Sequence, residues 1–66
     1  MARHVELEGR EFWILSEPHG DPQWRATVVE VKGGGEAEAL GIDATAETRT
    51  AADDAAERKL RRLLKA

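Results

Sequence analysis

The sequence predicts an α+β fold in which an antiparallel sheet of three or four strands carries one C-terminal helix on one face. Three observations lead to this prediction. Short segments of alternating apolar and polar residues occupy 1–47, stretches rich in glycine and proline separate them, and apolar residues recur at a helical period through 48–66. Short connections favour antiparallel neighbours, so the expected order is ββββα or, with one strand fewer, βββα. The 66 residues are expected to form a single domain, 1–66.

The first two strands are expected at 4–8 and 10–17. In the first, Val5 and Leu7 alternate with polar residues, which is typical of a half-buried strand. The second contains a run of apolar residues on both of its faces, so one face meets the helix and the other is partly exposed or covered by a partner. Between them, Glu8-Gly9 forms either a two-residue hairpin turn, which we favour, or a bulge in one longer strand.

The third strand is expected at 23–32, after a surface loop at 18–22 that consists of turn-forming residues. Its apolar alternation changes phase between Val28 and Val29. Two explanations fit this change. Either a β-bulge lies at this point or both faces of the strand are buried.

A fourth strand is expected at 39–47, after a glycine-rich connection at 33–36. Its apolar residues alternate with small or polar ones, which again indicates one buried face. The opposite, outer faces of the first and fourth strands are then acidic. They carry His4, Glu6, Glu8, Asp43, Thr45 and Glu47.

The helix is expected from Thr48 or Thr50 to the end of the chain at Ala66. One apolar stripe runs along it at spacings of three and four. Thr50 followed by Asp53 resembles a shortened capping box, which places Asp53 in the first turn, where the helix dipole favours acidic side chains. The side chains in the stripe are small at its start and large at its end. The stripe consists of Ala52, Ala55, Ala56, Leu60, Leu63 and Leu64.

Composition limits the classes of function. Thirteen acidic residues against ten basic ones give a net charge of −3, which disfavours nonspecific binding to nucleic acid. There is no cysteine, so neither a disulfide nor a thiolate metal site is expected. No apolar run reaches membrane-spanning length and no apolar signal segment opens the chain, so we expect a cytoplasmic protein without membrane contact. Because so small a domain is marginally stable, self-association is expected as an alternative to a protein partner.

No group of residues in the sequence has the pattern of a catalytic or cofactor site. His19 and Asp21 lie in a turn and match no metal-ligand spacing. Ser16 has no base near it in the sequence, and the glycines at 33–35 lead toward a strand rather than into the helix that a phosphate-binding loop requires. We therefore predict no catalytic residue, no metal, no cofactor and no enzymatic activity.

Trp13 and Trp24 are the candidate partner-binding residues. One of them is expected in the core, and a tryptophan left on the outer face would be a binding hot spot. If their strands pair, the two rings are expected near each other. The basic end of the helix is expected to serve solubility and to complement the helix dipole.

The segment from Trp24 onward resembles the last strands and final helix of double-stranded RNA-binding domains, and the residues at 48–56 correspond to the opening of that helix. That family has a Ser-Lys-Lys-x-Ala-x-x-Ala-Ala pattern there, and Ala52, Ala55 and Ala56 match its alanines. Only Arg49 remains of the basic pair, and the N-terminal helix of the family is replaced by strands. The resemblance implies RNA binding, with phosphate contacts from Arg49, Arg58, Arg61 and Arg62.

The chain also resembles HicB-type antitoxins and their small relatives, which have a strand-strand-strand-helix domain. The residues that carry this resemblance lie at 12–18, 24–28 and 50–55. The proline-glycine segment after the second strand of that family is absent. The resemblance implies a noncatalytic domain that binds a toxin partner. The sequence therefore predicts a noncatalytic protein-interaction module similar to HicB, with a double-stranded RNA-binding domain as the alternative.

Overall fold

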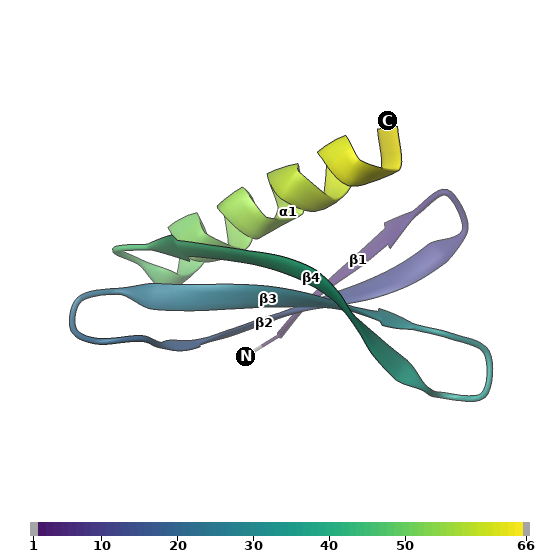
Figure 1. The fold of residues 1–66 in the computed structure, drawn as a ribbon, viewed down its shortest axis with the longest axis horizontal. Coiled ribbons are helices and arrows are strands. Elements are labelled where there is room, and N and C mark those ends of the chain that lie inside the picture. The colour runs from purple at the N-terminus through teal and green to yellow at the C-terminus, as the bar shows by residue number, and fades with distance from the viewer. Residues whose placement is uncertain (1, 66) are drawn as a thin grey trace.

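A computed structural model describes residues 2–65 of the chain. It confirms the predicted α+β fold: one antiparallel sheet with strand order β1-β2-β3-β4, and one C-terminal helix on one of its faces. The sheet is strongly twisted, and its β1–β2 and β3–β4 turns splay apart at one end (Figure 1). The elements are β1 Ala2–Leu7, β2 Arg10–Pro18, β3 Trp24–Val31, β4 Ala37–Ala46 and α1 Arg49–Lys65.

The turn between β1 and β2 is the predicted two-residue hairpin. Leu7 pairs with Arg10, so Glu8 and Gly9 alone connect the strands. Glu8 has a φ of 52° and Gly9 a φ of 75°. Positive φ at both central residues is the geometry of the type I′ turn, which matches the right-handed twist of the strands that it joins.

Of the two explanations left open for the change of phase in the third strand, a bulge in β3 is wrong. β3 alternates regularly from Trp24 to Val31 and pairs with β2 without a break, and it carries apolar residues on both faces, one buried and the other half-buried. The bulge lies in β4 instead. Thr27 pairs with Asp43 and Val29 with Ala39, so β4 has extra residues opposite Val28. Gly41, with a φ of 74°, lies within this bulge, in a backbone conformation that glycine adopts without strain.

The core lies between α1 and one face of the sheet, which we call the covered face. Phe12, Ile14, Val28 and Leu60 are its largest fully buried side chains. Beside them alanines of the strands meet alanines of the helix, and the absence of longer side chains lets the two layers approach closely. These alanines are Ala26, Ala44, Ala52 and Ala56.

The residue that caps the start of α1 is not the predicted one. The Thr48 hydroxyl, and not that of Thr50, accepts a hydrogen bond from the backbone N–H of Ala51 at 3.1 Å, and the helix begins at Arg49. Asp53 is therefore beyond the first turn and is buried, with 7% of its surface exposed. The predicted stripe is confirmed except at its end, where Leu63 is 54% exposed.

Cations fasten α1 to both edges of the sheet. On the β1 side, Arg3 bonds Asp54 at 2.8 Å and Glu57 at 3.1 Å. On the β4 side, the Lys59 ammonium donates to the backbone carbonyl of Asp43 at 2.7 Å. Hydrogen bonds from Arg61, and after them those from Arg3, hold the pKa of Glu57 below its ordinary 4.5. These contacts connect α1 to the first and last strands of the sheet.

One ion pair lies on the covered face itself. Arg10 donates hydrogen bonds of 2.9 Å and 2.7 Å to the carboxylate of Glu30, which lies on this face because β3 alternates regularly. A bulge in β3, one of the two explanations of its change of phase, would have put Glu30 on the outer face. The Glu30 side chain is only 11% exposed, so the paired guanidinium provides the partner that a buried carboxylate needs.

Candidate functional site

The sheet face opposite α1, which we call the open face, carries a contiguous apolar surface. Its central residues come from alternate positions of β2, β3 and β4, and pairing brings them side by side. Leu15 is 45% exposed, and the residues around it are half-buried or exposed. None of residues 2–65 forms a layer over this face. The apolar surface consists of Trp13, Leu15, Thr27, Val29, Val31, Ala37 and Ala39.

Trp13 is held in the middle of the open face by its neighbours on both sides. It pairs with His4 on β1 and with Val29 on β3. The His4 and Trp13 rings lie 4.8 Å apart between centroids, at a tilt of 50°. His4 Nε2 in turn lies 3.1 Å from a carboxylate oxygen of Glu11. Trp13 is thus a half-buried aromatic side chain in a fixed environment, the type that dominates binding energy at protein interfaces.

The β4 bulge makes a hollow of about 350 Å³ in the open face, next to the apolar surface that contains Trp13. Its walls include Thr27, Val29, Ala39 and Gly41. The chain bends away opposite Val28, and glycine leaves open space there, with nothing within 4 Å of the position that a Cβ would take. The hollow is large enough for an apolar side chain of a partner.

Acidic side chains border the open face on its β1–β2 half. Glu6 and Glu11 pair with each other across these strands, and Glu17 lies further along β2. On the other half, Arg25 and Asp43 form an ion pair of 2.8 Å that cancels their charges. Of the residues predicted for the acidic outer face, those on β1 and β4 do lie on the open face, but this face is acidic only on its β1–β2 half; Glu8 lies in a turn and Glu47 lies beyond the end of β4.

The two predicted partner-binding tryptophans lie on opposite faces. Trp24 is the first residue of β3 and pairs with Pro18. It packs on the covered side, half-buried against the core. The guanidinium of Arg49 lies 5.5 Å from the centre of its ring. β2 and β3 do pair, but the two rings are not neighbours, because Trp13 and Trp24 belong to opposite faces of the sheet.

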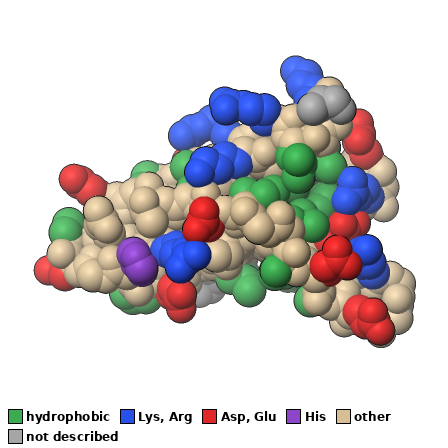
Figure 2. Space-filling model, viewed as in Figure 1, with side chains coloured by type: hydrophobic (Ala, Val, Ile, Leu, Met, Phe, Trp, Pro, Cys, Tyr) green, Lys and Arg blue, Asp and Glu red, His purple; other side chains and the backbone are tan. Residues whose placement is uncertain are grey.

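The arginines of the alternative RNA-binding hypothesis do not form one patch. At 3.6 residues per turn, Arg58 follows Arg49 by about two and a half turns and lies on the opposite side of α1. Arg61 gives both of its hydrogen bonds to Glu57. Arg58 and Arg62 are exposed neighbours on the solvent side, where Lys and Arg gather over α1 (Figure 2). Only two of the four residues are therefore adjacent and unpaired within residues 2–65.

The residues that were considered for a catalytic or metal site lie apart from one another. His19 and Asp21 are exposed in the β2–β3 loop, and Ser16 lies on the covered face. Within the described part of the chain, no three His, Cys, Asp or Glu side chains are grouped to hold a metal ion. No helix in that part is long and apolar enough to cross a membrane.

Sequence reasoning missed the hollow. The one available signal was Gly41 inside a strand pattern, which often marks a bulge. Its position next to Val29 and Thr27 depends on the register of β3 with β4, and single-residue patterns do not fix that register.

Comparisons with protein families, curated proteins and solved structures found no match to this chain. The resemblances to HicB-type antitoxins and to double-stranded RNA-binding domains therefore stay predictions.

Proposed function

We propose that the chain is a noncatalytic protein-interaction module that binds its partner through the open face, with Trp13 at the centre of the interface. The observation that carries this proposal is the contrast between the two sheet faces. α1 covers one face, whereas the other leaves an apolar surface around a half-buried tryptophan without a covering layer among residues 2–65. Contiguous apolar surface of this kind on a small domain marks a site of interaction.

The chemistry of the open face describes the partner. An apolar patch would cover Trp13 and Leu15, and a single apolar side chain would fill the hollow beside Val29. Lysine or arginine residues at the margin of that patch would face Glu6, Glu11 and Glu17, which favours association by complementary charge. The HicB resemblance supports the same kind of function, since it implies a noncatalytic domain bound to a protein partner.

The test is affinity capture from a lysate of the cells that express the chain, with and without nuclease, read by mass spectrometry and nucleic-acid staining. Wild type is compared with Trp13→Ser and with Leu63→Ser. The second variant is the matched control, because Leu63 is also an exposed apolar residue but lies on α1, away from the open face. We expect a protein that wild type and Leu63→Ser retain and Trp13→Ser loses, whether or not nuclease is present.

Two results would contradict the proposal. A partner that Trp13→Ser retains and Leu63→Ser loses would bind at the helix rather than the open face. Nothing captured, together with a monomeric mass in light scattering, would leave the open face without an occupant. A dimer that Trp13→Ser dissociates would instead identify a second copy as the partner.

Location in the cytoplasm also stays a prediction, which cell fractionation tests.

The alternative function is binding of duplex RNA through the solvent side of α1. The observation in its favour is the exposed pair Arg58 and Arg62. Two phosphate contacts would give weak binding that decreases with salt, at a slope of about 2 in a plot of log affinity against log salt concentration. Titration of duplex RNA into the ¹⁵N-labelled protein at low salt measures this binding, and unchanged shifts at Arg58 and Arg62 would exclude it.

A further inference from the structure

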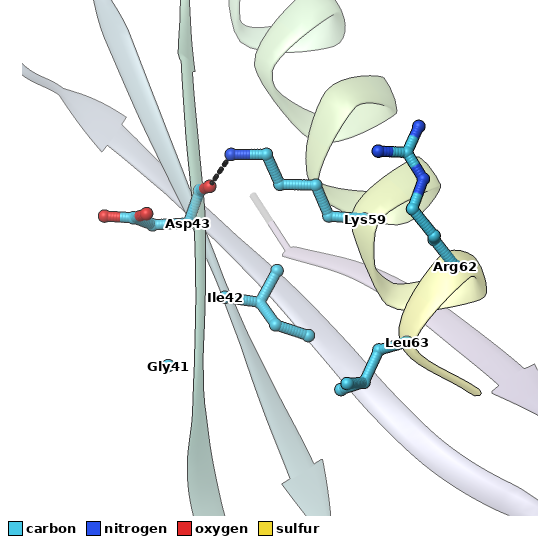
Figure 3. Close-up of a pocket in the computed structure, with 6 residues that line it drawn as sticks. All are labelled: Gly41, Ile42, Asp43, Lys59, Arg62 and Leu63. Atoms are coloured by element: carbon cyan, nitrogen blue, oxygen red, sulfur yellow. Dashed lines mark hydrogen bonds between the residues drawn. The ribbon is translucent and has the colours of Figure 1, made fainter. Parts of the chain in front are cut away.

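We propose that the groove between β4 and α1 binds an extended acidic peptide, which adds to the sheet as a strand next to β4. The groove has a volume of about 540 Å³ and is lined by Gly41, Ile42, Asp43, Lys59, Arg62 and Leu63. Figure 3 shows the side chains of Ile42 and Leu63 facing each other across it, from the strand and from the helix. Leu63 is one of the two large apolar residues that are exposed in the described part of the chain.

β4 offers backbone groups to such a peptide. It is the last strand in the sheet order, so one of its edges has no neighbouring strand among residues 2–65. The carbonyl of Asp43 points to this edge, because Lys59 reaches it from α1 with a hydrogen bond of 2.7 Å (Figure 3). From Asp43 to Ala46, beyond the bulge, β4 is a regular edge that can pair with an extended chain, and main-chain hydrogen bonds then supply affinity while pockets beside the edge select side chains.

The charge at the groove selects an acidic occupant. Lys59 bonds only a neutral carbonyl, and Arg62 forms no ion pair with any of residues 2–65. The one acidic side chain of the lining, Asp43, is already paired with Arg25 at 2.8 Å. The groove therefore carries uncompensated positive charge at its border, in a protein whose net charge is −3. Carboxylates of a peptide complement it.

The same charges disfavour a second copy of this chain at the groove. α1 lies against β4, so a two-fold axis perpendicular to the sheet at the β4 edge, which pairs the two β4 strands antiparallel, would bring the two helices next to each other. Arg62 and Lys59 of one copy would then face the same cations of the other. Like charges across an interface oppose association, so an acidic peptide suits the groove better than self-pairing does.

Lys59 has a specific part in this binding. In the free protein its ammonium covers the outward carbonyl of Asp43 and so protects the edge, as lysines on edge strands commonly do. A peptide N–H that pairs with Asp43 displaces the ammonium, which then faces a carboxylate of the incoming strand. One apolar side chain of the peptide enters between Ile42 and Leu63.

The experiment is a titration of the ¹⁵N-labelled full chain with two short, end-blocked peptides. In one peptide valine and glutamate alternate along one face of the strand with threonine between them, so that valine and glutamate both point toward α1, and in the other peptide lysine replaces glutamate. We expect saturable shift changes with the glutamate peptide at the amides of 41–43 and 59–63, and weaker changes with the lysine peptide. A proline placed in the middle of the glutamate peptide should abolish binding, because proline lacks the N–H that pairs with the edge.

Matched variants test the assigned residues. Lys59→Met should weaken the glutamate peptide about two- to fivefold, as expected for one exposed ion pair. Lys65→Met makes the same chemical change on the opposite side of α1, beside Leu7 and Leu64, and should leave the affinity unchanged. Leu63→Ala should weaken binding about five- to tenfold through loss of apolar contact.

Several results would overturn the proposal. Equal or tighter binding of the lysine peptide would refute the charge argument, and unchanged affinity in Lys59→Met and Leu63→Ala would refute the location. Saturable shifts centred on Trp13 or Val29 instead of Gly41 would assign the peptide to the open face. A concentration-dependent dimer that Leu63→Ala dissociates would show that a second copy occupies the groove.

Discussion

The two faces of the sheet come from the same strands, yet their side chains are buried to very different degrees. On the covered face, Phe12, Ile14 and Val28 are 1% exposed or less. On the open face, their sequence neighbours Trp13, Leu15 and Val29 are half-buried or exposed, although they are equally apolar. The difference shows that alternation in the strands supplies two apolar surfaces and that α1 satisfies only one of them. The second surface is available for function.

Polar side chains follow the same division. Glu30 on the covered face is 11% exposed and accepts two hydrogen bonds from Arg10. The ion pair on the open face is more exposed to solvent: the side chains of Arg25 and Asp43 are 41% and 51% exposed. Exposed pairs contribute little to folding. We therefore expect substitutions on the covered face to change stability, and those on the open face to change binding.

The largest effect is expected for Leu60→Asp. Leu60 is fully buried between α1 and the sheet, and an unpaired carboxylate there costs more than a domain of this size can lose. The variant should show no cooperative unfolding transition in circular dichroism. Leu63→Asp is the control, since Leu63 is 54% exposed and its loss should shift stability by less than about 0.5 kcal/mol. A Leu60→Asp variant that melts like wild type would refute the assignment of the helix face.

The sharpest comparison of the faces uses Val28 and Val29, which are adjacent in the sequence and point to opposite sides. Val28→Ala removes two methyl groups from a site that is 1% exposed and should cost about 2 kcal/mol in urea denaturation. Val29→Ala should cost less than about 1 kcal/mol, because its side chain already meets water. Equal losses would mean that another layer covers the open face in solution.

The fold was predictable because local patterns determine it. Val5 and Leu7, the Glu8-Gly9 turn and the stripe around Leu60 each indicate one element, and short connections leave few arrangements. Two details depended on tertiary contacts instead. The adjacent apolar residues Val28 and Val29 left two alternatives open, a bulge in β3 or burial of both of its faces, and only the pairing with β2 decides between them. The ion pair of Glu30 with Arg10 was not predictable, because the two residues are distant in the sequence.

The candidate site was less predictable than the fold. Trp13 and Trp24 were both identified, but which of them faces the helix follows from strand register and from the side that α1 occupies. Neither is determined by composition or periodicity near the tryptophans. The groove at Leu63 was hidden for the same reason, because a leucine at helical spacing is expected in the core and Leu63 lies just beyond the edge of β4.

A smaller effect is expected at the start of α1. Thr48→Ala removes the hydroxyl that accepts the Ala51 N–H, and should destabilise the domain by about 1 kcal/mol. Thr50→Ala should change stability by less than about 0.5 kcal/mol, because Thr50 is an exposed residue inside the helix. Thermal or urea unfolding of both variants shows whether Thr48 or Thr50 caps the helix. A larger loss in Thr50→Ala would restore the capping box that the sequence pattern suggested.

The smallest effect is expected in the pH dependence of the two faces. Hydrogen bonds from Arg10 hold the pKa of Glu30 below its ordinary 4.5 in the folded protein. A carboxyl whose pKa is lower in the folded state stabilises the fold above its unfolded pKa. That contribution is lost as the pH falls from 4.5 through the lowered value. Wild type should therefore be more stable than Glu30→Gln at neutral pH, and the difference should shrink in acid.

Glu11→Gln is the control for this measurement, because it makes the same change on the open face, where the side chain is 45% exposed. Urea denaturation of the three proteins at neutral pH and below 4.5 measures the difference. A gap between wild type and Glu30→Gln that stays constant over this range would show that Glu30 acts through packing. A larger acid-dependent change in Glu11→Gln would place the more strongly coupled carboxylate on the open face, and the division between a folding face and a binding face would then fail.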